Sequence, residues 1–291
     1  REQPGAGHWW GQECMDWPPL MDFLRARSLL PTAKRGSVTF VCASPTVNGR
    51  CDWALIDAQQ EPFVRSRIDL RRNLGDRRVD GSTSNVERLA IDLSAAGFDG
   101  EAPLRVELDG AVLADLPWPS DGVLWLERKG DVAWARIDPP GPQLKNHRRG
   151  GPFKSAFTGR VLFVYGTRGS PEENAALLAK ARFDAEIFWY RGNGSIEVIP
   201  DHQFDPSADP DRNVVLYGNA DTNGAWEALL RESPVQVGRA GVRVGSHTLL
   251  GDDLCTLFIR PRPGSNIASV GAVSGTGLVG TRLAERMPYF L

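Results

Sequence analysis

The hydrophobic period of this chain changes near Gly159, and that change constrains the fold more than any other feature. From Ser37 to about Asp138, short segments that alternate apolar and polar residues are separated by turn residues. Beyond Gly159, short apolar runs alternate with longer helical segments. A period of two is typical of strands, and strands that alternate with helices are typical of parallel α/β sheets. The sequence therefore predicts a mixed fold with two architectures in succession.

The region before the change predicts an all-β domain. Hairpin turns are expected at Asp109-Gly110 and at 129–131, and about seven strands at this spacing favour a β-sandwich. The arginine-rich stretch 65–78 is interleaved with aspartates, so we interpret it as a solvated face rather than a polyanion site. The expected strands are 37–41, 53–56, 66–70, 87–93, 104–108, 123–127 and 132–137.

The region after the change predicts a small α/β domain with a mostly parallel sheet, because its strands alternate with helices. The basic loop 145–152 separates this domain from the all-β region. The expected strands are 161–165, 213–217, 255–259 and 268–273, and the expected helices are 171–189 and 224–231.

A short proline-led helix is expected at residues 17–27. Pro18 and Pro19 suit a helix entrance, and the apolar side chains at positions 20, 21, 23 and 24 form one stripe. A polar linker follows the helix, so we place a domain boundary near residue 33. The expected domains are a tail at 1–32, the β-sandwich at 33–156 and the α/β domain at 157–291.

Charge and cysteine content argue against several classes of partner and site. With 34 Lys and Arg against 36 Asp and Glu, the net charge of -2 gives no global field that favours nucleic acid or an anionic membrane. No apolar run approaches the roughly 20 residues of a membrane helix. The four cysteines (14, 42, 51 and 255) show no Cys-x-x-Cys spacing, which argues against a zinc site or a redox dithiol. A Cys42–Cys51 disulfide and buried free thiols both stay open, and free thiols are favoured.

His8 is the strongest candidate for chemistry in the sequence. It follows a Gly-Ala-Gly turn and precedes the short helix, which is where α/β-hydrolases keep the histidine of a Ser-His-Asp triad. The run Pro4-Gly-Ala-Gly-His8-Trp-Trp, then Asp16-Trp-Pro-Pro, then Phe23-Leu resembles the end of the catalytic domain in prolyl-oligopeptidase-like serine hydrolases. About the first 30 residues carry this resemblance, so residues 1–32 are expected to be the tail of an α/β-hydrolase domain.

The resemblance implies an enzyme that cleaves peptide or ester bonds by acyl transfer, with His8 as general base and then general acid. No Gly-x-Ser-x-Gly motif occurs in the sequence, and in α/β-hydrolases the nucleophile and the acid precede the histidine. We therefore expect an upstream catalytic domain of the same polypeptide as the partner, a chain truncated at both ends, and no activity of these residues alone. No cofactor or metal is implied.

A second candidate site is a glycine-rich turn between an expected strand and an expected helix. Its members are Gly166, Thr167, Arg168, Gly169 and Ser170. Backbone N–H groups at a helix N-terminus bind phosphate or carboxylate groups, and an arginine would add charge. An ordinary structural turn, with the serine as the helix N-cap, is the alternative interpretation. Two further polar turns, 218–222 and 271–277, are expected at the same sheet edge.

Metal-binding patterns are weak in this sequence. The acidic loop 201–211 is interrupted by prolines and lacks the spacing of an EF-hand, so we expect a solvated loop. His147, His202 and His247 show no paired metal-ligand spacing, and no role is assigned to them.

Two other functions stay open. In the first, the chain is a non-catalytic binding or assembly module for a carbohydrate or protein partner; Trp118, Trp125 and Trp134 exposed on one sheet face would favour it. In the second, the α/β region is a small-molecule sensor or transferase relic that uses the turns at Gly169 and Gly275; turns filled by side chains would remove it.

Overall fold

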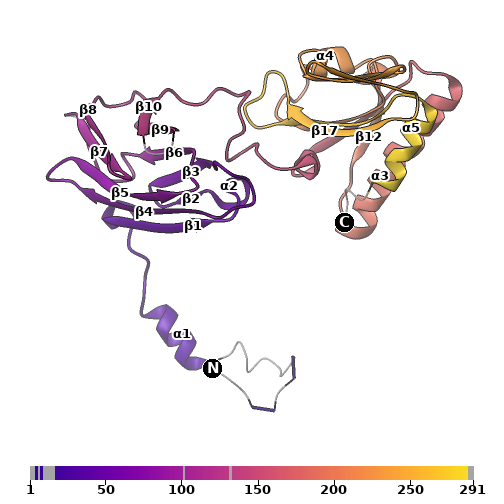
Figure 1. Cartoon of the computed structure of the whole chain (residues 1–291). Coiled ribbons are helices and arrows are strands. Elements are labelled where there is room, and N and C mark those ends of the chain that lie inside the picture. Colours follow the sequence, from indigo (N-terminus) through magenta and orange to yellow (C-terminus); the bar gives the residue numbers. More distant parts are fainter. Residues whose placement is uncertain (1–3, 6, 9–16, 101, 131–132, 288–291) are drawn as a thin grey trace. The chain divides into compact units, whose positions relative to one another are not determined.

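The computed structural model describes residues 4–5, 7–8, 17–100, 102–130 and 133–287. The chain divides into two compact units (Figure 1). Unit 1 comprises residues 1–41, 50–55 and 65–136, and unit 2 comprises 42–49, 56–64 and 137–291. The described residues form several sheets with a few helices, so the mixed fold is confirmed; the domain bounds 1–32, 33–156 and 157–291 remain predictions. No helix among these residues is long and apolar enough to cross a membrane.

Two five-stranded sheets are built mainly from unit 1. Their strand orders are β1-β4-β5-β7-β8 and β10-β9-β6-β3-β2. Along β4 and β9, buried side chains alternate with more exposed ones, which is why a period of two is visible in the sequence. The elements are β1 (Ser37–Cys42), α2 (Pro45–Asn48), β2 (Arg50–Cys51), β3 (Ala54–Ala58), β4 (Ser66–Asn73), β5 (Arg78–Ser84), β6 (Arg88–Asp92), β7 (Leu104–Leu108), β8 (Ala111–Leu116), β9 (Val123–Lys129) and β10 (Ala133–Ile137).

Strands β2, β5 and β8 were not predicted. β5 contains Asp80 and Gly81, which are both rare in strands, yet it pairs with β4 on one side and β7 on the other. A side chain at Gly81 would overlap the carbonyl oxygen of Asp69, so the glycine permits the two backbones to approach. Arg67 and Arg71 on β4 are exposed, in agreement with the solvated face that the sequence indicated.

The expected turn at Asp109-Gly110 joins β7 and β8 in an antiparallel hairpin. Both residues have positive φ, 52° and 84°, as a type I′ turn requires. The Asp109 carboxylate accepts hydrogen bonds from Thr83, Arg128 and Trp134 at 2.6–3.0 Å. Burial raises the pKa of Asp109, but these hydrogen bonds outweigh burial and hold the pKa below its ordinary value.

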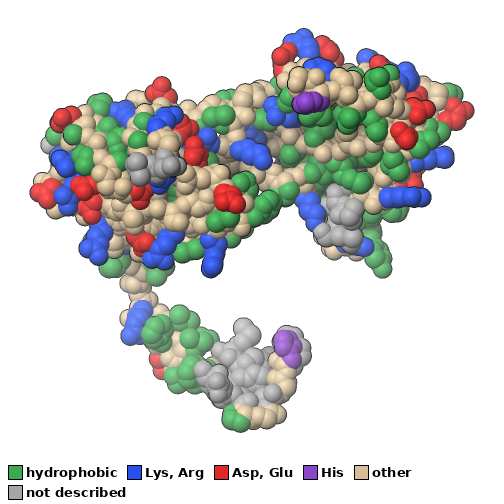
Figure 2. Space-filling view, in the orientation of Figure 1, with side chains coloured by type: hydrophobic (Ala, Val, Ile, Leu, Met, Phe, Trp, Pro, Cys, Tyr) green, Lys and Arg blue, Asp and Glu red, His purple; other side chains and the backbone are tan. Residues whose placement is uncertain are grey.

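The expected proline-led helix is α1 (Pro18–Arg25), and the 3₁₀ turn η2 (Thr32–Lys34) follows it. None of the α1 residues is buried. Leu20, Phe23 and Leu24 are 38%, 51% and 56% exposed, and Figure 2 shows hydrophobic side chains gathered over this helix. The apolar stripe that the sequence predicts is therefore present and largely uncovered.

Unit 2 is built on a five-stranded sheet with the order β12-β11-β13-β18-β17. Its pairs are parallel except at the edge, where β17 runs antiparallel to β18. The predicted strands 161–165 and 213–217 coincide with β11 and β13. The elements are η3 (Phe153–Phe157), β11 (Val161–Tyr165), α3 (Pro171–Gly192), β12 (Glu197–Pro200), η4 (Asp201–Gln203), β13 (Asn213–Tyr217), α4 (Trp226–Leu230), β17 (Cys255–Pro261), β18 (Ser269–Gly275), α5 (Leu278–Leu283) and η5 (Ala284–Arg286).

A second, three-stranded antiparallel sheet in unit 2 was not predicted. It consists of β14 (Val235–Gly238), β15 (Gly241–Val244) and β16 (His247–Leu250). All four residues of β16 are exposed, so this strand carries no alternation of buried and exposed positions. Without that alternation the sequence gives no periodic signal for a strand.

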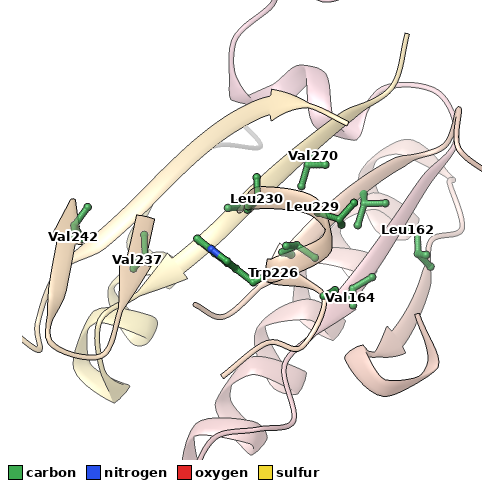
Figure 3. Close-up of a cluster of buried hydrophobic side chains, with 12 residues drawn as sticks. Leu162, Val164, Trp226, Leu229, Leu230, Val237, Val242 and Val270 are labelled. Carbon is green, nitrogen blue, oxygen red and sulfur yellow. The ribbon is translucent and has the colours of Figure 1, made fainter. Parts of the chain in front are cut away.

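Two clusters of buried side chains cover the two faces of the five-stranded sheet. Leu162 and Val164 of β11 belong to one cluster, whereas Val161 and Phe163 belong to the other. Successive side chains of a strand point to opposite faces, so β11 is buried on both. The first cluster gathers around Trp226 of α4 (Figure 3). Burial on both faces explains why β11 appears in the sequence as a continuous apolar run.

The described cysteines are free thiols. Cys42 is buried, and its thiol donates a hydrogen bond to the carbonyl oxygen of Asn48 at 2.9 Å. Cys51 and Cys255 are half-buried and also free. The disulfide alternative for Cys42 and Cys51 is therefore wrong, because β1 and β2 belong to different sheets and do not form a hairpin. Cys14 lies outside the described residues.

Candidate functional site

His8, the predicted general base, is exposed to solvent. Gly5 has a φ of 77°, a conformation that favours glycine. Trp9, Trp10 and Asp16, which belong to the same motif, lie outside the described residues. The catalytic role of His8 therefore stays a prediction.

The turn formed by Gly166, Thr167, Arg168, Gly169 and Ser170 connects β11 to α3. Ser170 is the N-cap of the helix and forms a capping box with Glu173, and Pro171 occupies the first turn. Arg239 pairs with Glu173 at 2.9 Å and lowers the Glu173 pKa. These features agree with the interpretation of an ordinary structural turn.

Every backbone N–H group of this turn already donates a hydrogen bond within the chain. The acceptors are Tyr217 O for Gly166 (2.9 Å), Asp201 Oδ2 for Thr167 (3.2 Å), Thr222 O for Arg168 (3.0 Å), Asn174 Oδ1 for Gly169 (2.9 Å) and Glu173 Oε2 for Ser170 (2.7 Å). Two of these acceptors are carboxylates. An external anion would have to displace them, so in this structure the turn has no N–H group to offer.

A carboxylate of the chain itself occupies the position at this turn where an external anion was expected. Asp201, which follows β12, is buried, and its carboxylate accepts hydrogen bonds from Thr167 Oγ1 and Gly224 N, both at 2.5 Å, in addition to Thr167 N. Asp201 thus connects the ends of three neighbouring strands. The sequence predicted a solvated acidic loop at 201–211, and this prediction is wrong for the Asp201 carboxylate, which is buried.

The other two polar turns are closed in the same way. Asn219 donates a hydrogen bond from Nδ2 to Gly275 O at 2.7 Å, and Asn223 donates from Nδ2 to Val164 O and Tyr217 O, both at 3.0 Å. A side chain at Gly275 would overlap the backbone of α5. The three turns lie together at the carboxyl ends of the strands, and side-chain hydrogen bonds within the chain connect them. These internal hydrogen bonds argue against the sensor or transferase alternative.

The three tryptophans that would have favoured a binding module are not exposed as a group. Trp134 is buried, and its ring lies 4.8 Å from the guanidinium of Arg128. Trp118 is half-buried against Gly100, and Trp125 is half-buried on β9. These side chains therefore form no exposed aromatic platform.

A hydrogen-bonded pair that the sequence did not indicate joins His147 to Asp57. His147 Nδ1 lies 2.7 Å from Asp57 Oδ1, and the His147 backbone N–H donates to the same oxygen at 3.1 Å. The Asp57 side chain is fully buried and that of His147 is partly exposed. Among the described residues, no hydroxyl or thiol group hydrogen-bonds to His147. The pair resembles two members of a catalytic triad without the third, and no sequence spacing points to it because 90 positions separate the residues.

A buried polar cluster joins α3 to β13. Lys180 Nζ donates to Asp184 Oδ1 at 2.7 Å, and the Tyr217 hydroxyl donates to Asp184 Oδ2 at 2.9 Å. All three side chains are buried. Burial raises the pKa of the nearby Cys255 thiol, and the charge of Lys180 partly offsets that effect. The thiol is therefore protonated at neutral pH and is a poor nucleophile.

The remaining histidines are placed apart from one another. His202 Nδ1 lies 3.8 Å from Asp201 Oδ1, and His247 is exposed on β16. Within the described ranges, no group of three or more His, Cys, Asp and Glu side chains could hold a metal ion.

No family model, no curated protein and no solved structure matches this chain. Its function is therefore argued from its own residues.

Proposed function

We propose that this chain is the C-terminal portion of a serine hydrolase, a peptidase or esterase that acts by acyl transfer, and that His8 is the general base. Residues 1–32 are assigned to the tail of an α/β-hydrolase domain whose nucleophile and acid lie upstream in the same polypeptide. The uncovered apolar face of α1 is the observation that supports this proposal best.

The eight residues of α1 are too few for a stable isolated helix. Helices of this length are marginal in water, and in proteins they gain most of their stability by packing an amphipathic face. Leu20, Phe23 and Leu24 form such a face and are at least one-third exposed. Because the resemblance makes this the last helix of a catalytic domain, we propose that the apolar face of α1 packs against the core of that domain.

The chemistry assigned to His8 follows from the triad mechanism. One ring nitrogen takes the proton of the serine hydroxyl as the serine attacks a peptide or ester carbonyl, and later gives that proton to the leaving group. The other ring nitrogen is held by a carboxylate, which fixes the tautomer. The glycines before His8 leave the loop free of side chains that would obstruct the nucleophile.

Unit 1 and unit 2 are accessory to this reaction in the proposal. We infer that the two sheets of unit 1 pack face to face as a β-sandwich, because β4 and β9 each bury alternate side chains. In unit 2 the strand ends that commonly bind ligands in α/β folds are hydrogen-bonded within the chain, which supports a non-catalytic role for that edge.

Fluorophosphonate labelling of the full-length polypeptide tests the assignment of His8. The wild type should label, and His8→Ala should abolish labelling because the serine loses its base. His247→Ala is the matched control, since His247 is an exposed histidine in unit 2, and it should label like the wild type. Equal labelling of His8→Ala, or none in the wild type, would refute the proposal and favour the non-catalytic binding module.

Limited proteolysis of the same polypeptide tests whether the apolar face of α1 packs against a hydrolase core. Leu24→Asp puts a charge into the apolar face and should accelerate cleavage around residues 17–27. Leu29→Asp is the control, because Leu29 lies after the helix and is exposed. Equal cleavage rates in both variants would contradict packing of α1 against a hydrolase core.

A further inference from the structure

Unit 2 contains a basic cavity that none of the sites above uses. The cavity has a volume of about 420 Å³ and lies among the loop 143–152, α2 and β17. Its lining includes four cationic side chains and no aspartate or glutamate. The cationic residues are Lys145, Arg148, Arg149 and Arg260. A cavity of this size is in the range of small-molecule sites, and its charge selects anions.

Arg149 is the buried member of this group, with 8% of its surface exposed. Its Nη1 donates to the carbonyl oxygens of Ser265 (2.7 Å) and Ala268 (3.1 Å), and its Nη2 donates to that of Pro142. The Nε atom is buried and has no hydrogen-bond partner. The guanidinium is thus held in place by three carbonyl groups while its buried Nε–H donor stays unused, and a buried donor without a partner is costly.

The charge of Arg149 is also uncompensated. Among the described residues, no carboxylate forms an ion pair with Arg149, Arg148 or Arg260. Burial alone lowers the pKa of Arg149, and no opposite charge counters that effect. A buried charge is ordinarily paired with an opposite charge, and within the described residues this one is not.

Other buried cations of the described chain differ from Arg149 in this respect. Arg128 pairs with Asp109 at 2.6 Å, and Lys180 pairs with Asp184 at 2.7 Å. Arg262 also has an unpartnered Nε, but its guanidinium donates to four carbonyl groups and feels the charges of two nearby aspartates. Arg262 does not line the cavity.

The cavity also has an apolar wall. Val47, Leu144 and Ile267 line it, and they are 87%, 49% and 42% exposed. Exposed aliphatic side chains beside clustered guanidinium groups fit a ligand with an anionic head and a non-polar body. An inorganic ion alone would leave this wall uncovered.

We propose that this cavity binds a small organic molecule that carries a phosphate or sulfate group, with Arg149 as the buried anchor. Three guanidinium groups without carboxylate partners match a group of two negative charges better than a single carboxylate. The Arg149 Nε–H supplies a hydrogen bond to an oxyanion, and Arg148 and Arg260 supply further charge. The site is independent of the proposed hydrolase function.

Side-chain NMR of arginine Nε–H groups tests the anchor in the intact chain. Titration with inorganic phosphate at constant ionic strength should shift the Arg149 Nε–H signal saturably, and the signal is assigned from its loss in Arg149→Lys. The Arg262 Nε–H signal is the internal control and should not move. An unmoved Arg149 signal, or equal shifts of both signals, would overturn the proposal.

Calorimetry with phosphate, sulfate and acetate tests the class of ligand. One site per chain is expected, with acetate the weakest, and Arg260→Gln should weaken binding about tenfold because it removes a charged donor. Arg243→Gln is the matched control on the exposed β15 hairpin of unit 2 and should bind like the wild type. If phosphate binds and sulfate does not, the ligand class is assigned as phosphate esters. If sulfate binds as tightly as phosphate, the cavity is assigned as a site for tetrahedral oxyanions of either kind. Absence of saturable binding, or equal weakening in Arg243→Gln, would refute the site.

Discussion

Removal of the carboxylate at Asp184 should destabilise unit 2 more than any other single change in α3. This carboxylate accepts hydrogen bonds from Lys180 at 2.7 Å and from the Tyr217 hydroxyl at 2.9 Å, and none of the three side chains is more than slightly exposed. Asp184→Ala therefore takes this carboxylate away from a buried ammonium group and from a buried hydroxyl.

The expected loss follows from those two consequences. Breaking a buried ion pair from one side lowers the free energy of unfolding by about 3–5 kcal/mol, since the remaining charge stays in a poorly solvated site. Lys180→Met should lower the free energy of unfolding by less, because the Asp184 carboxylate keeps the Tyr217 hydrogen bond. The double variant Lys180→Met/Asp184→Ala removes both charges of this ion pair, so it should be more stable than Asp184→Ala alone.

Hydrogen exchange in increasing urea measures this loss in unit 2 separately from unit 1. Peptides from α3 and β13 report the cluster, and peptides from β4 report unit 1 and serve as the internal control. A single melting temperature is unsuitable because two compact units need not unfold in one step. A loss of less than about 1 kcal/mol in Asp184→Ala, or a double variant whose loss equals the sum of the two single losses, would contradict a stabilising ion pair between Lys180 and Asp184.

Three further changes test other contacts. Asp201→Ala removes the acceptor of three hydrogen bonds and should lower the free energy of unfolding of unit 2 by about 2–4 kcal/mol, whereas Asp201→Asn, which keeps one acceptor, should lose less; urea unfolding gives the order. Because the Asp109 pKa is lower in the folded state, the ionised carboxylate stabilises unit 1 fully above pH of about 4, and this stabilisation is lost as the pH falls through the folded pKa. Asp109→Asn should therefore make the free energy of unfolding of unit 1 depend less on pH in the acidic range. An unchanged pH dependence would contradict this. Gly275→Ala forces its Cβ against the backbone of Thr281 and should destabilise unit 2 far more than Gly141→Ala, whose Cβ meets no atom; equal thermal shifts would exclude the clash.

Elements with a strong burial pattern were predictable from the sequence. β11 and β13 appear with their observed bounds because both faces are buried and every position is apolar or nearly so. The hairpin at Asp109-Gly110 was predictable because few dipeptides tolerate two successive positive φ angles. β5 was not predicted because it contains Gly81, a residue with low strand propensity. The glycine is needed there because the neighbouring backbone lies too close for a side chain, and local propensity does not include such tertiary contacts.

Contacts between distant segments were not predictable. The carboxylate of Asp201 reaches Thr167 across 34 positions, and composition alone indicates an acidic loop rather than the one side chain that turns inward. The basic loop 145–152 was visible as a charged stretch, but burial of Arg149 depends on carbonyl groups of residues 142, 265 and 268. The sequence therefore indicated that polar groups gather in unit 2 without indicating which of them lack partners.

The strand order of unit 2 has a consequence for synthesis on the ribosome. β13 lies between β11 and β18, yet β18 follows it only after α4, three short strands and β17. Until residues 269–275 have left the exit tunnel, the nascent chain presents one edge of β13 with unpaired N–H and C=O groups beside apolar side chains. Such an edge is a template for association with other chains. Unit 2 is therefore most exposed to misassembly late in translation, during the interval before β18 joins the sheet.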